Sequence, residues 1–424
     1  MIPVLILSFI VRLINLNQSL WLDEAIEALA VKNNSFIELV SRYAVFDYSP
    51  PLYHVILKAW TNIFGYSEIS LRLPSVVFGV LTVALVFLIA KKLFNHKVAF
   101  LAGTFLALNP LAVYYSQEAR RYSLAALAIT ASVYFFLQKK WFWFGLALLI
   151  ALYTDYLTWF MIPIFFLLKK KTAIIFIFLL PAIFLLREQL AAGMQLARDN
   201  PLWSQVVGGF DFKSIPLTFV KFIFGRITID NKIFYAAIFG PVALFYLWIL
   251  SEAKNKILWL WLAIPIILGA IISVKIPIFS YFRFLFILPA FCLLLAEGTK
   301  TKKVFVIFII FINFISIIIF NLNPRFQRED WRSAVVYMEK SSSKVFIPSL
   351  AQADPIYYYR KNLVIRDKEN LVIGPENTVF LIRYVREIFD QRDFLKKVLE
   401  LSGYQKVEEK SFNGVVIWKY ENRN

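Results

Sequence analysis

Long apolar stretches alternate with short polar, lysine-rich segments along the first three quarters of the sequence. A transmembrane helix needs about 20 mostly apolar residues, and stretches near this length recur as far as residue 321. The pattern therefore predicts an α-helical polytopic membrane protein with about eleven transmembrane helices. The predicted spans are residues 2–16, 71–90, 98–113, 122–138, 141–155, 157–168, 172–186, 232–250, 257–273, 281–296 and 304–321.

The lysine residues predict how these spans are oriented. Lysine clusters recur at intervals of two crossings, and such clusters mark the cytoplasmic loops of membrane proteins. They are Lys91, Lys92 and Lys97; Lys139 and Lys140; Lys169 to Lys171; Lys254 and Lys256; and Lys300, Lys302 and Lys303. We expect a multi-pass protein of the plasma membrane with a cytoplasmic N-terminus. Its outer segments would be residues 17–70, 114–121, 187–231, 274–280 and 322–424.

Two further apolar segments, residues 50–64 and 215–227, are excluded from the predicted spans. Both are shorter than a usual span and contain basic side chains. Counting either one as a crossing would move every later lysine cluster to the outer side of the membrane. We interpret both segments as interfacial helices on the outer side.

The first predicted span is expected to be retained in the mature chain. Residues 1–16 lack a basic leading region, and no Ala-x-Ala-type cleavage site follows near Asn17. Arg12 would lie near the outer end of this helix, where it could snorkel to the interface or face the protein interior.

The composition changes at Asn323, where charged residues become frequent and apolar runs shorten to strand length. We predict a catalytic membrane module at residues 1–321 and a small extracytoplasmic α/β domain at residues 322–424. The pattern predicts helices at 330–340, 354–360 and 389–401, and strands at 344–347, 378–383 and 415–420. Because the domain has no glycine-rich phosphate loop, we assign no active site to it.

Composition narrows the possible chemistry. With 59% hydrophobic residues and a mean hydropathy of +0.65, the chain requires a membrane environment. A single cysteine, Cys292, excludes an intrachain disulfide framework and a Cys-rich zinc site, and two histidines exclude a His-rich metal site. The net charge of +18 comes from lysines between apolar spans, so we expect membrane lipids and not nucleic acid as partners.

Two adjacent carboxylates, Asp23 and Glu24, follow the first predicted span. A carboxylate at this low-dielectric boundary can act as a general base or bind a cation. An alternative explanation has equal weight, because acidic residues also favour the first turn of a helix.

The same outer segment contains Asp47, Tyr53 and His54 around the proline pair Pro50 and Pro51. Prolines suit a first helical turn, so a helix start explains them completely. It does not explain Asp47 or His54, which remain candidate binding residues, although a lone histidine is more often structural.

The second outer segment places Glu118, Arg120, Arg121 and Tyr122 at a membrane boundary. The two arginines could bind a phosphate, with Glu118 orienting one of them. A snorkelling interfacial loop with an exposed ion pair is the alternative. Arg283, at the start of a later span, could likewise clamp a phosphate or only anchor the helix.

Taken together, these segments resemble the GT-C superfamily of integral membrane glycosyltransferases. The resemblance is to the family of protein O-mannosyltransferases and the lipid A aminoarabinose transferase. It rests on Leu-Trp-Leu-Asp23-Glu24, on residues 47–53 and 64–74, and on the segment from Asn109-Pro110 to Tyr122. Arg283 and the segment from Arg328 to Arg332 are also similar. The match is strong over residues 15–125 and depends mainly on topology beyond them.

The resemblance implies an inverting transferase that takes a sugar from a polyprenyl-phosphate donor at the outer face. Asp23 would be the catalytic base, supported by Glu24. The phosphate leaving group would be stabilised by Arg120, Arg121 and Arg283. Tyr53, His54 and Tyr122 would help to bind donor or acceptor. No cofactor is required, although Asp47 or Glu118 could hold a divalent metal.

The acceptor could be a lipid, a glycan or a protein. Ser49 precedes the proline pair, where the protein mannosyltransferases have a histidine, so a protein acceptor does not follow from the resemblance. Two other functions remain open. A transporter or flippase of lipid-linked sugars would show the same hydropathy, but no internal repeat is evident. If the chain were a scaffold, the acidic residues of the outer segments would have no functional explanation.

Overall fold

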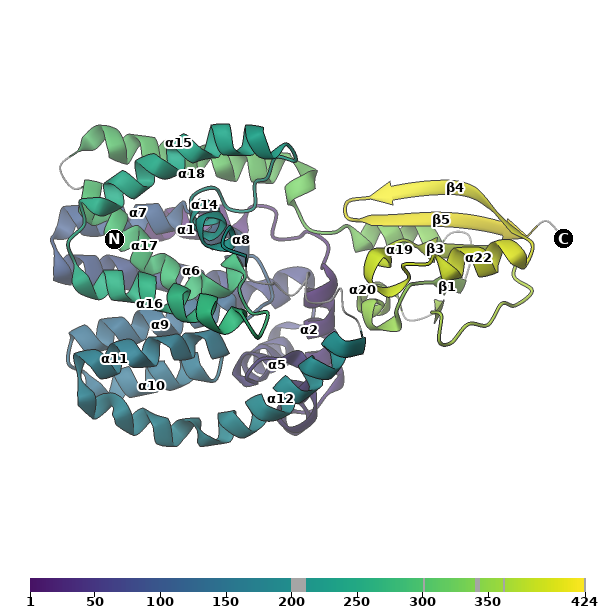
Figure 1. Ribbon diagram of the computed structural model, residues 1–424, viewed down its shortest axis with the longest axis horizontal. Helices are drawn as coiled ribbons and strands as arrows, with labels where there is room; N and C mark the ends of the chain where they lie inside the picture. The colour runs from purple at the N-terminus through teal and green to yellow at the C-terminus, as the bar shows by residue number, and fades with distance from the viewer. Residues whose placement is uncertain (200–210, 300–301, 340–343, 361–362, 423–424) are drawn as a thin grey trace.

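The computed structural model describes residues 1–199, 211–299, 302–339, 344–360 and 363–422. It consists of a large helical body and a smaller C-terminal domain built on a β-sheet (Figure 1). The helical, multi-pass architecture with a small C-terminal α/β unit confirms the predicted fold class.

Every predicted span coincides with helical structure. The single helices are α1 (Ile2–Leu13), α6 (Glu68–Leu93), α9 (Tyr122–Leu137), α10 (Trp141–Leu152), α15 (Lys232–Ser251), α16 (Lys256–Ser273) and α18 (Lys303–Leu322). The composite ones are α7 (His96–Ala107) with α8 (Pro110–Ser116), η2 (Tyr156–Met161) with α11 (Ile162–Leu168), η3 (Lys170–Leu179) with α12 (Leu180–Asp199), and η4 (Tyr281–Ile287) with α17 (Leu288–Thr299). Among the described residues, six helices are long and apolar enough to cross a membrane, or seven if α7 and α8 form one span. The remaining predicted spans are shorter helices, so the total of eleven crossings stays a prediction.

The predicted span 98–113 is not one straight helix. It breaks between α7 and α8 with a bend of 58°. Pro110 begins α8, and the Asn109 side chain accepts hydrogen bonds from the Leu111 and Ala112 amides, both at 3.0 Å. Proline at the first position and asparagine at the cap are strong helix-start signals, which explains the break. Consequently Tyr114 belongs to α8, and the predicted outer loop 114–121 begins later than expected.

The segments that we excluded from the predicted spans form α5 (Leu52–Phe64) and α14 (Ser214–Phe224), of 13 and 11 residues. The segment predicted to be the first outer one also folds into α2 (Leu22–Asn33), α3 (Phe36–Glu38), η1 (Leu39–Tyr43) and α4 (Ala44–Asp47). In Figure 1, α2 and α5 lie at the end of the helical body that faces the C-terminal domain. All candidate residues of the first outer segment are therefore held on or beside short helices.

The C-terminal domain follows a connecting segment, residues 323–330, that contains η5 (Pro324–Phe326). Its elements are α19 (Trp331–Glu339), β1 (Lys344–Phe346), η6 (Leu350–Gln352), α20 (Asp354–Tyr359), β2 (Val364–Arg366), β3 (Thr378–Ile382), α21 (Arg386–Phe389), α22 (Phe394–Leu401), β4 (Tyr404–Phe412) and β5 (Val415–Asn422). The strand order is β2-β1-β3-β5-β4, with β1 parallel to both neighbours and β5 antiparallel to β3 and β4.

Two strands of this sheet, β2 and β4, were not predicted. β2 has only three residues, and β4 is an edge strand whose central residues are exposed and mostly charged. Consecutive side chains of this edge strand are exposed to solvent. Its sequence therefore lacks the alternation of apolar and polar residues on which strand prediction depends. The other strands were predicted because their apolar residues, such as Val345, Phe380 and Ile417, form the buried core.

Candidate active site at the first outer helices

The two adjacent carboxylates lie in the first turn of α2, as the helix-start alternative expected, and they face different surroundings. Glu24 is completely buried. It accepts hydrogen bonds from Arg72 Nε at 2.8 Å, from Arg72 Nη2 at 2.5 Å and from the Ala119 amide at 2.8 Å. Arg328 Nε lies 3.6 Å from its Oε2 atom. The carboxylate that we predicted to support catalysis therefore ties α2 to three other segments.

Asp23, in contrast, keeps 35% of its side chain exposed. Its Oδ2 atom lies 3.6 Å from Arg120 Nη2. Burial of the carboxyl raises the pKa of Asp23 above its ordinary value; Arg120 opposes this rise, and the nearby Asp47 carboxylate adds to it. Asp23 is thus a more basic carboxylate than usual at a position that a substrate can reach.

A buried histidine joins two further carboxylates beside Asp23. Glu27 Oε1 lies 2.6 Å from His54 Nδ1, and Asp47 Oδ2 lies 3.2 Å from His54 Nε2. The Ser49 hydroxyl donates a hydrogen bond to Asp47 Oδ2. Burial alone would lower the pKa of His54, but the two carboxylates raise it to about 10. His54 is therefore an imidazolium at neutral pH.

Arg120 faces all three acids. Its Nη atoms lie 3.6 Å from Asp23 Oδ2, 3.7 Å from Glu27 Oε2 and 4.0 Å from Asp47 Oδ1. Burial would raise the pKa of Asp47, but His54 and Arg120 lower it below its ordinary value. We call these five side chains, Asp23, Glu27, Asp47, His54 and Arg120, the acid cluster. Its two cations offset most of the charge of its three carboxylates.

The other predicted phosphate-binding side chains adjoin the acid cluster. Arg121 Nε donates a hydrogen bond to Asp155 Oδ2 at 2.8 Å, and its guanidinium lies 5.3 Å from the centre of the Tyr122 ring. Arg283 is half-buried and interacts electrostatically with Tyr122, Arg121, Asp155 and Asp23. The structure thus brings the predicted arginines and Asp23 together.

Two predicted residues lie away from the accessible side of the cluster. Tyr53 is 1% exposed and its ring packs edge-on against the His54 ring, so it helps to hold the His54 side chain in place. Glu118 is also buried, and its Oε1 lies 3.8 Å from Arg328 Nη2. Burial raises the pKa of Glu118 to about 7, although Arg328 opposes the rise. Glu118 therefore belongs with Glu24 and Arg328, not with the acid cluster.

The geometry also bears on a metal. Within the described residues, one group of side chains has metal-ligand spacing, namely Glu27, Asp47 and His54. Glu118, which we had considered with Asp47, is not part of it. The two ring nitrogens of His54 face different carboxylates, so one ion could bind Nε2 and Asp47 while Glu27 held Nδ1. Arg120 lies within 4.0 Å of both acids and competes with any cation for them.

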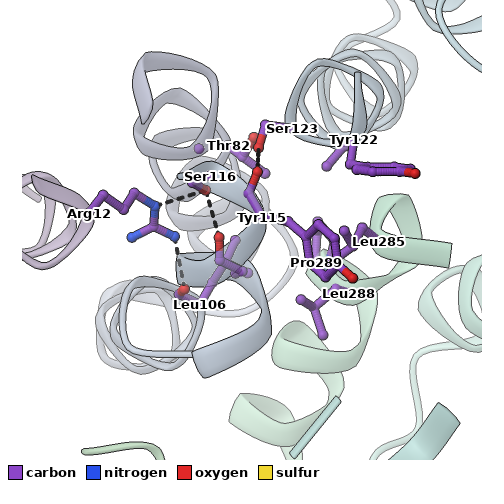
Figure 2. A pocket seen from close by; sticks show the side chains of 13 residues that line it. Arg12, Thr82, Leu106, Tyr115, Ser116, Tyr122, Ser123, Leu285, Leu288 and Pro289 are labelled. Carbon is purple, nitrogen blue, oxygen red and sulfur yellow. Dashed lines mark hydrogen bonds between the residues drawn. The ribbon is translucent and has the colours of Figure 1, made fainter. Parts of the chain in front are cut away.

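A small cavity of about 30 Å³ is lined partly by Tyr122. Figure 2 shows Arg12 on one side of it and Tyr122 on the other, with Ser116 and Tyr115 between them. Arg12 faces the protein interior, where it donates hydrogen bonds to Ser8 Oγ at 2.8 Å, the Ala107 carbonyl at 3.0 Å and Ser116 Oγ at 3.1 Å. The second of the two positions expected for Arg12 is therefore the observed one.

The structure also has an apolar cavity of about 400 Å³, whose lining includes residues at the start of α5, the helix that carries Tyr53 and His54. It is lined by Val40, Pro51, Leu52, Val55, Leu149, Ile150, Tyr153 and Phe178. The Leu52 amide donates a hydrogen bond to the Tyr153 carbonyl at 3.2 Å, which joins the two walls. One lining residue, Tyr153, is two residues before Asp155, the partner of Arg121.

The sequence prediction did not include several residues of the site. Glu27 follows Asp23 by four residues and so shares its helix face, a spacing that could have identified it. Asp155 is the last residue of the predicted span 141–155 and had no predicted role. Arg72 and Arg328 were part of the resemblance but had no assigned role, because nothing in the sequence pairs them with Glu24.

Comparisons with known proteins bear on the fold of the chain and on its family. A family model for dolichyl-phosphate-mannose-protein mannosyltransferases matches residues 48–187. ArnT from Cupriavidus metallidurans in the apo state is similar in structure, with a TM-score of 0.57 at 11% identity, covering 99% of this chain and 96% of that one. No curated protein matches the sequence significantly. The chain has the GT-C fold.

Other GT-C structures extend the likeness. ArnT bound to undecaprenyl phosphate gives a TM-score of 0.56 at 11% identity, with 98% of this chain and 96% of that one covered. The archaeal oligosaccharyltransferase AglB from Archaeoglobus fulgidus, in complex with an inhibitory peptide and a dolichol-phosphate, gives 0.53 at 13% identity, with 98% and 74% covered. The predicted GT-C resemblance is confirmed, and together with the family model these likenesses support a membrane glycosyltransferase.

Proposed function

We propose that the chain is an inverting glycosyltransferase that transfers a sugar from a polyprenyl-phosphate donor at the outer face of the membrane. The observation that carries this proposal is the position of Asp23. It is 35% exposed, whereas the side chains of Glu24, Glu27, Asp47 and Asp155 are at most 6% exposed. An accessible carboxylate of raised pKa, beside several arginines, suits proton removal next to a departing phosphate.

In the proposed reaction, Asp23 removes the proton of an acceptor hydroxyl as its oxygen attacks the anomeric carbon. The new carbon–oxygen bond forms on the face opposite the phosphate, so the configuration inverts. The bond between the anomeric carbon and the phosphate oxygen breaks, and its electron pair leaves with the polyprenyl phosphate. Asp23 holds the proton until it passes to water.

The arginines would stabilise the phosphate as its charge grows. Arg121 is held by Asp155 at 2.8 Å, and Arg283 lies close enough to interact with both. Arg120 remains bound within the acid cluster and orients Asp23 at 3.6 Å. Preorganised cations of this kind stabilise a developing anion with little reorganisation.

The apolar cavity would hold the first part of the polyprenyl chain. Its wall of aliphatic and aromatic side chains suits an isoprenoid, and its lining residue Tyr153 is two residues before Asp155, which holds Arg121. Two similar structures contain undecaprenyl phosphate and dolichol-phosphate, which supports a lipid-linked donor. Lateral entry from the bilayer would bring the phosphate to the arginines.

We further propose the expected topology, with the N-terminus cytoplasmic and the C-terminal domain outside. The acceptor would then be a lipid, glycan or protein of the cell envelope. We also propose that no divalent metal is needed, because His54 and Arg120 already compensate the acids that could bind one.

The test is transfer of labelled sugar from a panel of polyprenyl-phosphate sugars to membrane acceptors. Asp23→Asn should reduce kcat by about 100- to 10,000-fold, the usual contribution of a general base. Asp230→Asn is the matched control, because Asp230 is 82% exposed and pairs only with Arg325 among the described contacts. Equal rates for wild type and Asp23→Asn would remove Asp23 from the mechanism. Donor movement across liposome bilayers without any transfer would instead favour a transporter.

A further inference from the structure

The connecting segment between the helical body and the C-terminal domain inserts a buried arginine beside α2. The Arg328 side chain is 1% exposed. Its Nη2 atom donates hydrogen bonds to the carbonyls of Gln117 at 2.7 Å and Tyr114 at 3.2 Å, and its guanidinium lies 4.6 Å from the Tyr114 ring centre. Arg328 also pairs with Glu24 at 3.6 Å. One side chain thus contacts both α2 and the segment that leads to Arg120.

The next residue, Glu329, reaches the start of α2. Its carboxylate accepts hydrogen bonds from Trp331 Nε1 and from the Tyr384 hydroxyl, both at 2.8 Å. The amide of Leu22, the first residue of α2, is a further hydrogen-bond partner of this carboxylate. Trp21 occupies the N-cap position, and an indole cannot accept a hydrogen bond from the helix N–H groups. Glu329 therefore supplies the negative group that favours a helix start.

The C-terminal domain contacts the turn before α2 at two more points. The Leu20 amide donates a hydrogen bond to the Tyr359 hydroxyl at 2.8 Å, and the Arg332 amide donates one to Ser19 Oγ at 3.1 Å. These two contacts and the one between Glu329 and Leu22 fall on residues 19–22, immediately before Asp23. A domain that carries no candidate catalytic group thus holds the backbone that presents the proposed base.

We propose that Arg328 and Glu329 are positioning residues, through which the C-terminal domain sets the distance between Asp23 and Arg120. Arg328 holds the segment that leads to Arg120, and Glu329 holds the start of α2, the helix that carries Asp23. This inference rests on the proposed role of Asp23. The C-terminal domain would then be required for turnover and not for binding of the donor.

The experiment compares full-length wild type with Arg328→Lys, Glu329→Gln and Tyr384→Phe in one detergent. Lysine keeps the charge of Arg328 but cannot reach two carbonyls and Glu24 together. For the first two variants kcat should fall by about 100-fold, the effect of a misplacement near 1 Å, while the KM for the donor stays unchanged. Tyr384→Phe removes one hydrogen bond at nearly constant volume, so its effect should be smaller and its folding preserved.

Arg325→Ala is the matched control, because Arg325 lies in the same segment and forms an exposed pair with Asp230. Its kcat should equal that of wild type. Hydrogen exchange is measured on the same samples without donor. In the variants of Arg328 and Glu329, exchange of the α2 amides should accelerate, whereas exchange of the α15 amides should stay as in wild type. Unchanged kcat in all three variants would overturn the proposal, as would a rise in KM with kcat intact.

The two readouts separate this inference from the proposed function. If wild type transfers no sugar from any donor, the transferase proposal fails, and α2 exchange still tests the anchoring of the helix. Unchanged α2 exchange in the variants of Arg328 and Glu329 would then refute the anchoring itself.

Discussion

Two charged clusters lie on different sides of α2, and they show how the same residue types serve different purposes. The cluster around Glu24 contains Arg72, Arg328 and Glu118, and all four side chains are at most 1% exposed. The acid cluster has a similar mixture of carboxylates and cations, yet Asp23 opens it to solvent. A sealed ion pair can only hold segments together, whereas an accessible carboxylate can exchange a proton with a substrate.

The difference arises from the geometry of one helix. Consecutive residues of an α-helix point about 100° apart, so Asp23 and Glu24 cannot share a face, whereas Glu27 lies one turn along from Asp23. Asp23 and Glu24 are adjacent in the sequence but therefore belong to different clusters, whereas Asp23 and Glu27, four residues apart, belong to the same cluster. The comparison predicts that mutations in the sealed cluster around Glu24 mainly damage stability, with Arg328 also affecting turnover through the position of Asp23. Mutations in the acid cluster should mainly damage turnover.

The largest effect is expected from removing one cation of the sealed cluster, which consists of Glu24, Arg72, Arg328 and Glu118. Arg72→Ala removes the two hydrogen bonds to Glu24 and leaves a carboxylate buried with only part of its partners. Loss of one member of a buried pair typically costs about 3–5 kcal/mol. Thermal unfolding in detergent should show a large fall in Tm, whereas Arg332→Ala, at a half-exposed pair with Glu68, should cost no more than about 1 kcal/mol. A similar Tm for both variants would contradict the assignment of a structural role to this cluster.

The second largest effect is expected from Arg121, which adjoins the acid cluster. Arg121→Gln removes the cation that Asp155 holds at 2.8 Å, so the leaving phosphate would lose a fixed partner. The kcat should fall by about 100- to 1,000-fold, the usual cost of one preorganised donor. Because Asp155 is only 5% exposed, Tm should also fall, and the kinetics are therefore measured below the unfolding transition. Steady-state kinetics with a saturating donor measure this directly. A rise in KM alone would show that Arg121 binds the donor equally in ground and transition states.

How far the sequence predicted this site depends on the type of contact. The helices, including the short α5, and the presence of Asp23 near arginines followed from hydropathy and the resemblance, because these signals are local. The partners of Glu24 could not be predicted, since Arg72 and Arg328 lie 48 and 304 residues away along the chain. Glu118 was grouped with Asp47 for the same reason, because its burial beside Arg328 depends on how the connecting segment packs.

A smaller effect is expected from pH, and it concerns the sealed cluster again. Burial raises the pKa of Glu118 from 4.5 to about 7. A carboxyl with a raised folded pKa favours folding below its unfolded pKa, and this contribution is lost as pH rises through about 7. Between pH 5 and 8 the wild type should lose roughly 3 kcal/mol at most, and Glu118→Gln should lose less. Parallel Tm curves for both proteins over this range would contradict a neutral Glu118 below pH 7.

The smallest effect is expected from removing divalent metal. In the acid cluster, His54 is an imidazolium whose two ring nitrogens face Glu27 and Asp47, and Arg120 lies 4.0 Å from Asp47. A metal at Nε2 would have to displace that proton and compete with the arginine, both of which oppose binding of a second cation. Transfer by wild type should therefore be unchanged after dialysis against EDTA. Loss of transfer that Mn²⁺ restores would contradict this and would require Asp47 and His54 to rearrange around the ion. His54→Gln would then lose the Mn²⁺ response, whereas under the metal-free mechanism it would lower kcat equally with and without EDTA.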